Sequence, residues 1–424
     1  MLDIKFIREN PEDIKADLRK RNQPEKIAWV DDLLDKDKRY RQALQECDIL
    51  RNRRNTISEE INQLKKQGKD IAGKVAEIKE LPKKIAEMEA ELEELKAKIR
   101  NYQMTIPNIL HESVPIGKDD SENAVVKTWG KIKKQKFELK PHGELLESIG
   151  LANFSDAARV SGHGFYYLLG DIALLEMALM QYAVGKLVEK GYVLVSPPFM
   201  LRRKPYEGVT SLEDFENVMY KIENEDLYLI ATSEHSIGAM LMDKVIEPEN
   251  LPLKYAGISP CFRKEVGSHS LDTKGLFRVH QFYKIEQFIF CKPEDSWKFH
   301  EELLANAEEI FQGLKLPYRV VNICTGDIGI IASKKYDIEV YMPREEKYRE
   351  VVSCSNCTSY QAVRLNLKFR NGDDKEYLHT LNSTAIATTR AIRAIVEHYQ
   401  NEDGTINVPT VLQKFVGKKV IGKK

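Results

Sequence analysis

Two long stretches of helical periodicity near the N-terminus constrain the fold of this chain more than any other feature. Between residues 36 and 66, and again between residues 75 and 102, apolar side chains recur every three or four positions. That spacing lines one face of an α-helix. The short segment QGKDIAG separates the two stretches, which predicts an antiparallel hairpin. At ~1.5 Å per residue its helices would extend for roughly 45 Å as an arm.

The two apolar series define the expected contact between these helices. Arg54 must occupy one place in the first series, and Pro82 predicts either a kink in the second helix or its true start. The first series is Tyr40, Leu44, Cys47, Leu50, Ile57, Ile61 and Leu64. The second is Val75, Ile78, Leu81, Ile85, Met88, Leu92, Leu95, Ile99 and Tyr102.

Charge is distributed unequally between the two helices. The whole chain has 65 basic and 65 acidic residues, so attraction to nucleic acid or membrane requires a local patch. Between residues 36 and 66 there are nine Lys or Arg against five Asp or Glu, whereas residues 74 to 100 hold seven of each. The first helix is therefore the basic one. Its basic face is either a solvated face of the coiled coil or a phosphate-binding surface. Its basic side chains include Arg39, Arg41, Arg51, Arg53, Arg54, Lys65 and Lys66.

The chain has the composition of an intracellular protein. It has six scattered cysteines and does not begin with a basic segment followed by an apolar one, which suits a reducing cytoplasm better than secretion. No run approaches the ~18 apolar residues that a membrane-spanning helix requires. We therefore expect a cytoplasmic protein that does not bind membranes.

The rest of the chain predicts a second domain of the α+β class. Residues 107–130, rich in helix breakers, form an expected linker between an N-terminal domain of residues 1–106, with its hairpin at about 36–103, and a domain of residues 131–424. The second domain alternates helical segments, near 172–190 and 385–399, with strands such as GYVLV. This order predicts a mixed, mainly antiparallel β-sheet flanked by helices.

One predicted strand, GLFRVHQFYKIEQF at residues 275–288, carries charge on one face. Alternation places one set of its side chains on the same side and packs Val279, Tyr283, Ile285 and Ile289 on the other. At ~3.4 Å per residue the first row spans roughly 27 Å, which suits a long ligand, although an exposed sheet face with solvated charges is the alternative. That row is Arg278, His280, Phe282, Lys284 and Glu286.

The preceding strand repeats this arrangement and carries a family resemblance. FRKE, with Arg263 and Glu265, is followed by the loop VGSHSLDTKG and by GLFRVHQFYKIE. This pattern resembles motif 2 of the class II aminoacyl-tRNA synthetases, and of the seryl-tRNA synthetases in particular. GYVLVSPPFM resembles motif 1, LYLIATSEHS the serine-pocket segment, YREVVSCSNCTSYQAVR the metal-binding strand, and TLNSTAIATTRAIRAIVEHYQNEDGTINVPTVL motif 3. With the arm, the resemblance covers nearly the whole chain.

The resemblance implies an ATP site. Arg263 would hold the α-phosphate and stabilise its transition state, Phe282 would stack on adenine, and Arg390 would bind the γ-phosphate. Arg390 would lie in the first turns of the motif 3 helix, which follows NST; an exposed arginine there is the alternative. The implied ATP-binding residues are Arg263, Glu265, Arg278, Phe282, Glu350, Val351, Ser353 and Arg390.

It also implies a metal site and a serine site. Glu350 and Ser353 would bind Mg²⁺, which prefers hard oxygen ligands. Glu286 and Thr384 would bind the substrate hydroxyl, so that alanine would be rejected by on the order of 10⁴-fold. The implied serine-binding residues are Thr232, Glu234, Arg263, Glu286, Asn382 and Thr384, and the implied catalytic residues are Arg263, Arg390 and Glu286.

Some segments depart from the family pattern, and others admit a second interpretation. Val352 stands where many relatives have serine, and GSHSLD differs from commoner motif 2 loops. Cys354 and Cys357 form a CxxC pair, but no second CxxC or spaced histidine pair completes a zinc site. The terminal KKVIGKK is either a solvated tail or an additional phosphate contact.

The resemblance further implies the partners and the reaction. The arm would bind the shape and backbone of serine tRNA, through Arg39, Arg51, Arg53, Arg54, Lys65 and Lys66, and motif 1 would form a homodimer. The enzyme would activate L-serine with ATP and transfer it to the terminal ribose of serine tRNA, and of selenocysteine tRNA where present. Two alternatives are a paralogue that loads a carrier protein, which would lack the arm, and an inactive interaction protein, which would lack Arg263, Arg390, Glu286 or Glu350.

Overall fold

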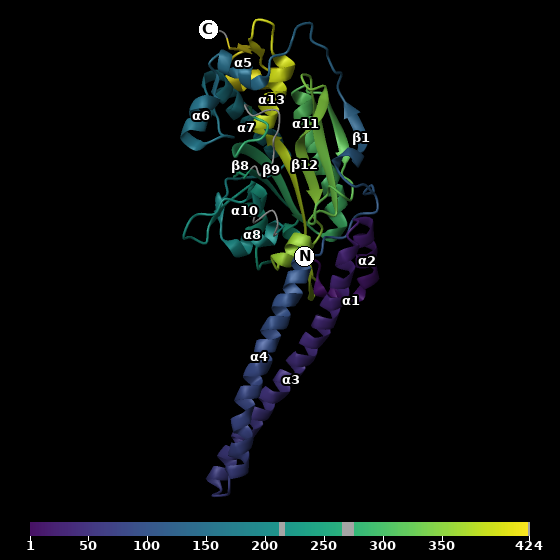
Figure 1. The fold of residues 1–424 in the computed structure, drawn as a ribbon, viewed down its shortest axis with the longest axis vertical. Coiled ribbons are helices and arrows are strands. Elements are labelled where there is room, and N and C mark those ends of the chain that lie inside the picture. The colour runs from purple at the N-terminus through teal and green to yellow at the C-terminus, as the bar shows by residue number, and fades with distance from the viewer. Residues whose placement is uncertain (212–216, 265–274, 423–424) are drawn as a thin grey trace. The chain divides into compact units, whose positions relative to one another are not determined.

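The structure is a computed structural model that describes residues 1–211, 217–264 and 275–422 (Figure 1). The chain divides into two compact units, Leu2–Pro107 and Asn108–Lys424, with Met1 assigned to the second. Each unit has its own packed interior. Within the described ranges, no helix combines the length and apolar character needed to cross a membrane.

The first unit is entirely helical. Two short helices, α1 (Ile4–Glu9) and α2 (Pro11–Lys20), precede the long helices α3 (Ile27–Lys66) and α4 (Ala72–Thr105). Beyond the end of α3 at Lys66, Gly68 has a φ of 65° in the left-handed region, and the Lys69 amide donates to the Leu64 carbonyl. The hairpin is confirmed, and both of its helices are longer than predicted. Pro82 lies inside α4, so the prediction that it marks the start of that helix is wrong.

The contact between α3 and α4 follows a heptad that is interrupted at Arg54, which is exposed, and that differs from the predicted series at Leu44. The buried positions include Ala43 and Cys47, which pack on Ile85 and Leu92, whereas Leu44 is 38% exposed. Steps of three and four residues from Tyr40 lead to position 43 and then to 47. A small alanine at such a position lets the two helices approach closely, so the predicted place of Leu44 in the series is wrong.

The second unit contains an eight-stranded sheet in the order β1-β10-β11-β12-β15-β9-β8-β4. Neighbouring strands are antiparallel except for β4, which pairs in parallel with β8 at one edge. β1 forms the other edge and falls within the range expected to be a linker. The strands are β1 (Ala124–Trp129), β4 (Val193–Val195), β8 (Leu253–Phe262), β9 (Gln281–Cys291), β10 (Tyr318–Asn322), β11 (Lys334–Met342), β12 (Lys347–Asn356) and β15 (His379–Ala387).

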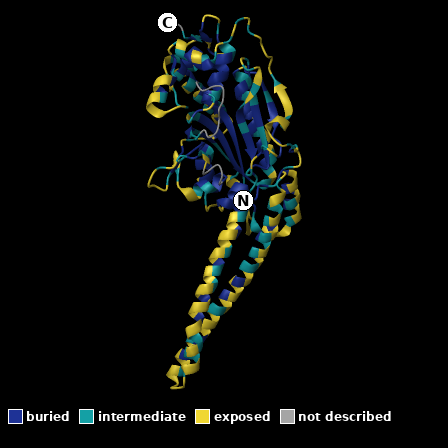
Figure 2. Ribbon diagram, viewed as in Figure 1, coloured by how far each residue is buried: buried dark blue, intermediate teal, exposed yellow. Residues whose placement is uncertain are grey.

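Helices cover both faces of this sheet. α7 (Gly170–Glu189), α11 (Ser296–Gly313) and α13 (Thr388–Tyr399) pack on the face that bears Ile285 and Ile289. α8 (Arg203–Val209), α10 (Ser233–Ala239) and α12 (Tyr360–Arg364) share a second cluster with Phe288 and Phe290. Alternation along β9 separates the two clusters, and the sheet interior is buried throughout (Figure 2).

Smaller elements complete the second unit. They are α5 (His142–Ser148), β2 (Ala152–Asn153), α6 (Phe154–Ser161), β3 (Tyr167–Leu168), β5 (Met200–Leu201), β6 (Tyr228–Leu229), β7 (Val245–Ile246), β13 (Lys368–Asn371), β14 (Asp374–Tyr377), β16 (Ile406–Asn407), α14 (Gln413–Val416) and β17 (Val420–Ile421).

Two predicted boundaries are wrong. Residues 275–280 precede β9, so Arg278 and His280 do not belong to the strand. The segment NST, expected just before the motif 3 helix, lies within β15, and α13 begins four residues later at Thr388. Antiparallel pairing with β9 holds this segment extended. The loop between β8 and β9 falls mostly on residues 265–274, outside the described residues.

Candidate active site

Arg263 lies directly after β8, at the side of the sheet where β9 begins. Its backbone amide donates to the His280 carbonyl at 3.0 Å, and its Nε donates to the Ala231 carbonyl at 3.3 Å. The guanidinium carbon is 5.4 Å from the centre of the Phe282 ring. Arg263 and Phe282 thus form a half-buried cation–aromatic pair, and the ring and the Ala231 carbonyl limit the positions that the guanidinium can adopt.

The other residues predicted to bind the nucleotide at this hairpin have different surroundings. Arg278 is exposed, and Glu265 lies outside the described residues. His280, by contrast, is tightly held. Its Nδ1 is 2.9 Å from the Arg263 carbonyl and 2.7 Å from the Tyr220 hydroxyl. A Cβ at Gly164, where φ is 82°, would lie 2.5 Å from the His280 ring, so this contact requires glycine.

Arg390 is the third residue of α13 and contacts β12. Its Nη1 is 3.1 Å from Glu350 Oε1 and donates to the Glu350 carbonyl at 2.9 Å. Partial burial opposes ionisation of Glu350, but the charges of Arg390, Lys335 and Arg263 outweigh this effect and lower its pKa. Arg263, Arg390 and Glu350 therefore share one electrostatic environment.

A β-bulge brings Glu350 and Ser353 to the same face of the sheet. Residues three apart in a regular strand point to opposite faces. Here Ile338 pairs with Val352 but Glu339 pairs with Glu350, which leaves Val351 as the surplus residue of β12. Glu350 and Ser353 therefore lie on one side, and both valines lie in the core on the other.

Asp337 joins this pair from the neighbouring strand. It lies opposite Ser353, and it is 6% exposed. Its Oδ1 has no hydrogen-bond partner among the described residues. Burial raises the pKa of Asp337, the Lys335 ammonium 3.8 Å away opposes that shift, and the negative charge of Glu350 adds to it. A carboxylate, a hydroxyl and an unsatisfied buried carboxylate oxygen are a donor set suited to a divalent cation.

Two buried carboxylates form a second site beside the first. Glu234 is the second residue of the short helix α10, and the hydroxyl of the N-cap residue Thr232 accepts a hydrogen bond from its amide at 3.2 Å. The Glu234 carboxylate accepts hydrogen bonds of 3.1 Å from both Asn382 and Gln361. Burial, followed by the negative charge of Glu286, raises the pKa of Glu234 to about 7.

Glu286 is paired differently. Its carboxylate is 2.5 Å from the Lys284 ammonium, with side-chain exposures of 2% and 7%. The Thr384 hydroxyl donates to it at 3.3 Å across the β9–β15 pair. Burial raises the pKa of Glu286 even though Lys284 opposes the shift. Besides Arg263, five side chains are predicted to form the serine pocket. Two of them are Glu234 and Glu286, and each of the others hydrogen-bonds one of these two residues: Thr232, Asn382 and Thr384.

The two thiols of the CxxC pair have different environments. Cys354 lies in the main core and its thiol donates to the His300 carbonyl at 3.8 Å. The Cys357 sulfur instead accepts from Asn382 at 3.7 Å. Cys357 therefore supports a side chain that contacts Glu234.

Comparisons with known proteins agree with this geometry. Residues 1–110 match the seryl-tRNA synthetase N-terminal domain, and residues 217–399 match the core domain of the class II tRNA synthetases for glycine, histidine, proline, serine and threonine. A serine–tRNA ligase of Methanocella arvoryzae is 60% identical over 419 residues, which is 98% of this chain and 99% of that protein.

The chain belongs to the seryl-tRNA synthetase family. Two solved structures extend the similarity to the whole fold. A seryl-tRNA synthetase from Pyrococcus horikoshii, complexed with ATP, has a TM-score of 0.92 and 51% identity, covering 99% of each chain. A cytoplasmic serine–tRNA ligase from Naegleria fowleri, in complex with AMP, has a TM-score of 0.87 and 37% identity, covering 99% of this chain and 98% of that one.

Three side chains complete the two candidate sites of this seryl-tRNA synthetase, and the sequence alone predicts no role for them. The sequence predicts Lys284 on the charged face of its strand and names no partner for it. In the structure its ammonium neutralises the Glu286 carboxylate. Gln361 lies in the segment YREVVSCSNCTSYQAVR and donates a hydrogen bond to Glu234. Asp337 alternates with Lys335 and Glu339 along KKYDIEVYM, and this charged alternation in an apolar strand was the signal available for finding it.

Proposed function

We propose that the second unit activates L-serine with ATP and transfers the seryl group to the terminal ribose of serine tRNA. The observation that carries this function is the meeting of Arg263, Arg390 and Glu350 beside the buried carboxylates Glu234 and Glu286. The first group of charges suits a triphosphate, and the second suits an ammonium and a hydroxyl. The two substrates of the reaction carry these groups.

In the first step a serine carboxylate oxygen attacks the α-phosphorus of ATP, and the bond from that phosphorus to the bridging oxygen of pyrophosphate breaks. Arg263 supplies positive charge where the transition state gains negative charge. Phe282 stacks on adenine, Arg390 binds the γ-phosphate, and the remaining proposed contacts to ATP are Glu265, Arg278 and Val351. In the second step a hydroxyl oxygen of the tRNA ribose attacks the seryl carbonyl carbon and loses its proton, and the bond from that carbon to the phosphate oxygen breaks, so that AMP leaves.

We propose that Glu350 and Ser353 hold Mg²⁺, which neutralises phosphate charge when it is bound. Both groups offer hard oxygen atoms on one face of β12, and the unpartnered Oδ1 of Asp337 faces the same strand pair. ATP affinity that depends on Mg²⁺ in the native chain but not in Glu350→Ala would support this assignment; equal dependence in both would contradict it.

The serine pocket distinguishes the substrate by its polar groups. Glu234 faces the ammonium, Glu286 and Thr384 contact the hydroxyl, and Thr232 and Asn382 hold the pocket in shape. Alanine would leave the Glu286–Thr384 pair without its partner, which penalises the smaller substrate.

Pyrophosphate exchange with each proteinogenic amino acid tests the function. We expect serine to support exchange, with alanine at least about 10³-fold poorer in kcat/KM. Exchange with another small amino acid, together with no charging of tRNA, would favour the carrier-loading paralogue. No exchange with any amino acid would favour an inactive interaction protein.

Serine binding should depend on pH near neutrality because the pKa of the Glu234 carboxyl is raised. With a pKa of about 7, this carboxyl is mostly neutral at lower pH and cannot pair with the ammonium. We expect kcat/KM for serine to fall by about tenfold per pH unit below that value. Initial rates of exchange at low serine, measured from about pH 6 to about pH 8, check this expectation.

A matched variant separates Glu234 from the other charged groups that face it, which are Glu286, Lys284 and Arg263. Glu234→Gln keeps a side chain of the same size and cannot ionise. Its kcat/KM for serine should be low and should no longer show the step near neutral pH. A step that persists unchanged in Glu234→Gln would assign the titration to another group.

We propose that the first unit binds tRNA through the basic face of α3. Among the six predicted contacts, Arg54, Lys65 and Lys66 are exposed and have no acidic partner among the described residues. Arg39 and Arg51 instead pair with Glu91 at 2.6 Å and Glu89 at 2.8 Å, and Arg53 pairs with Glu77. The unpaired cations are therefore the most available for phosphate.

We propose a homodimer that buries the surface of α7 and β4. Leu174 and Met177 on α7 are 45% and 53% exposed, and Val193 and Leu194 on the edge strand β4 are 59% and 47% exposed. Exposed apolar side chains on adjacent elements mark interaction surfaces. Sedimentation of the chain as a monomer at micromolar concentration would contradict the dimer.

We also propose a cytoplasmic location for the protein. All six cysteines are free thiols, which a reducing compartment maintains. Cell fractionation tests this location, and recovery of the protein outside the cytoplasm would contradict it.

A further inference from the structure

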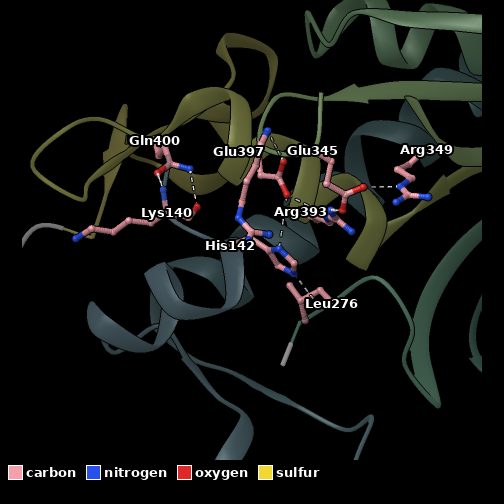
Figure 3. Close-up of polar contacts among 9 residues, drawn as sticks. Lys140, His142, Leu276, Glu345, Arg349, Arg393, Glu397 and Gln400 are labelled. Atoms are coloured by element: carbon pink, nitrogen blue, oxygen red, sulfur yellow. Dashed lines mark hydrogen bonds and ion pairs between the residues drawn. The ribbon is translucent and has the colours of Figure 1, made fainter. Parts of the chain in front are cut away.

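A polar cluster, buried or half-buried except at Arg349, contacts the residues that lead into β9 and has no role in the proposed reaction. This cluster, named here the α13 network, consists of His142, Glu345, Arg349, Arg393 and Glu397 (Figure 3). It joins the first residue of α5 to α13 and to the turn between β11 and β12.

His142 fixes one backbone position. Its Nε2 accepts the amide of Leu276 at 2.9 Å, and both residues are almost completely buried. Because an accepting imidazole nitrogen carries no proton, the neutral ring has its proton on Nδ1. That atom is 3.7 Å from Glu397 Oε1. The imidazole therefore hydrogen-bonds the residue directly before Phe277 and lies beside Glu397 of α13, to which Nδ1 forms no hydrogen bond.

Phe277 contacts both arginines of the first turns of α13. The guanidinium carbon of Arg393 is 4.8 Å from its ring centre, and that of Arg390 is 5.2 Å away. Arg393 is immobilised, because it pairs with Glu397 at 2.9 Å and with Glu345 and is 1% exposed. Arg390 is the outer of the two arginines, with a side chain 26% exposed.

The network also extends to the turn between β11 and β12. Glu345 pairs with Arg393 and, at 2.5 Å, with Arg349 on β12, while the Arg344 amide donates to Glu397 at 3.4 Å. Arg349 is adjacent to Glu350 in the same strand. One set of charges, buried at Arg393 and Glu397 and exposed at Arg349, thus contacts the backbone segments on both sides of the Arg390–Glu350 pair.

We propose that Phe277 and His142 are positioning residues for Arg390, and that they set the affinity of the enzyme for ATP. The aromatic face favours one placement of the Arg390 guanidinium, and the His142 hydrogen bond fixes the backbone that carries the ring. Without the ring, Arg390 must be ordered by the nucleotide itself, which weakens binding. This inference rests on the proposed function of Arg390 as a γ-phosphate ligand.

Steady-state pyrophosphate exchange with the full chain tests the inference. Phe277→Leu keeps an apolar side chain and removes the aromatic face, so KM for ATP should rise by about fivefold to tenfold. KM for serine should stay within about twofold, because Glu234 and Glu286 do not contact the α13 network. Phe277→Tyr keeps the ring and should restore the native KM for ATP.

Two variants of His142 test the second link. His142→Phe keeps a ring but cannot accept the Leu276 amide, and it should raise KM for ATP in the same way. His142→Gln offers an acceptor oxygen near the Nε2 position and should lie close to the native enzyme. His398→Phe is the matched control: this histidine also lies on α13, but it contacts the Tyr341 carbonyl at 2.6 Å and should leave KM for ATP unchanged.

A double-mutant cycle separates this inference from the proposed function. Arg390→Ala should raise KM for ATP, and adding Phe277→Leu should then have no further effect. An unchanged KM for ATP in Arg390→Ala would overturn the proposed role of Arg390 and the inference with it. A normal KM for ATP in Phe277→Leu, equal rises for both substrates, or additive effects in the double variant would overturn the inference alone. If His142→Phe does not fold, as judged by thermal melting, the Phe277 variants decide.

Discussion

Replacing Arg263 with alanine is expected to lower kcat for serine-dependent pyrophosphate exchange by about 10³-fold. The guanidinium is the positive group held between the Phe282 ring and the Ala231 carbonyl. It also belongs to the charges that surround Glu234, Glu286 and Glu350. Its removal takes away charge at the α-phosphate in the transition state and removes part of the positive charge that compensates these carboxylates. The measurement is the initial rate of labelled pyrophosphate entering ATP.

A second arginine provides the control for this loss. Arg319 on β10 also contacts an aromatic ring, that of Tyr348 at 4.7 Å, and it pairs with Glu339. Arg319→Ala therefore removes a comparable cation–aromatic pair outside the proposed site and should keep exchange within about threefold of the native rate. If Arg263→Ala retained a rate in that range, Arg263 would have no catalytic role.

Shortening the hairpin is expected to abolish charging of tRNA while amino acid activation continues. Removing residues 51–80 and closing the gap with a short glycine–serine turn deletes the tip, including Arg54, Lys65 and Lys66. The Arg39–Glu91 ion pair and the Ala43–Leu92 cluster remain at the base. Loss of this many cations should lower kcat/KM for tRNA by at least about 10²-fold, because each phosphate contact contributes to affinity.

Two assays on the same preparation determine whether this expectation holds. Exchange of pyrophosphate should stay within about twofold of the native rate, since every residue of the proposed serine and ATP sites lies in the second unit. Charging is followed by acid-stable incorporation of serine into tRNA. Native charging by the shortened chain would refute the proposed role of the arm, and loss of both activities would indicate damage to the second unit.

Point variants of the full-length arm refine the same experiment. Alanine at Arg54, Lys65 and Lys66 removes cations that have no acidic partner among the described residues, so KM for tRNA should rise and its dependence on salt should weaken. Alanine at Arg39 and Arg51 removes cations already paired with Glu91 and Glu89. The second set should have the smaller effect. The reverse order would show that the tRNA competes for the paired arginines.

The sequence predicted the elements whose pattern is local. Heptad spacing gave the hairpin, and the α+β class followed from the order of segments. The errors arose where packing partners decide the outcome. Ala43 rather than Leu44 is buried because close helix packing favours a small side chain, and NST is extended because β9 pairs with it. Neither partner is visible in a short window of sequence.

The candidate sites depended on the family resemblance more than on pattern. Alternation alone would place Glu350 and Ser353 on opposite faces, and only the pairing of β11 with β12 reveals the bulge. Lys284 and Asp337 form contacts across or along strands that no spacing rule specifies. Buried carboxylates acquire their partners from several elements at once, and such sets can be assigned only when those elements are placed.

The surplus residue at Val351 makes the β-bulge a determinant of chemistry. If β12 paired regularly with β11 through this interval at its present length, Glu350 and Ser353 would point to opposite faces, and one of the two proposed oxygen ligands would turn into the hydrocarbon interior. Deleting Val351 would instead leave them two residues apart, again on one face. Substitutions at Val351 that keep an apolar side chain leave this parity intact, whatever their shape. The bulge in this short interval therefore decides whether the two proposed ligands of one ion lie on the same side of the sheet.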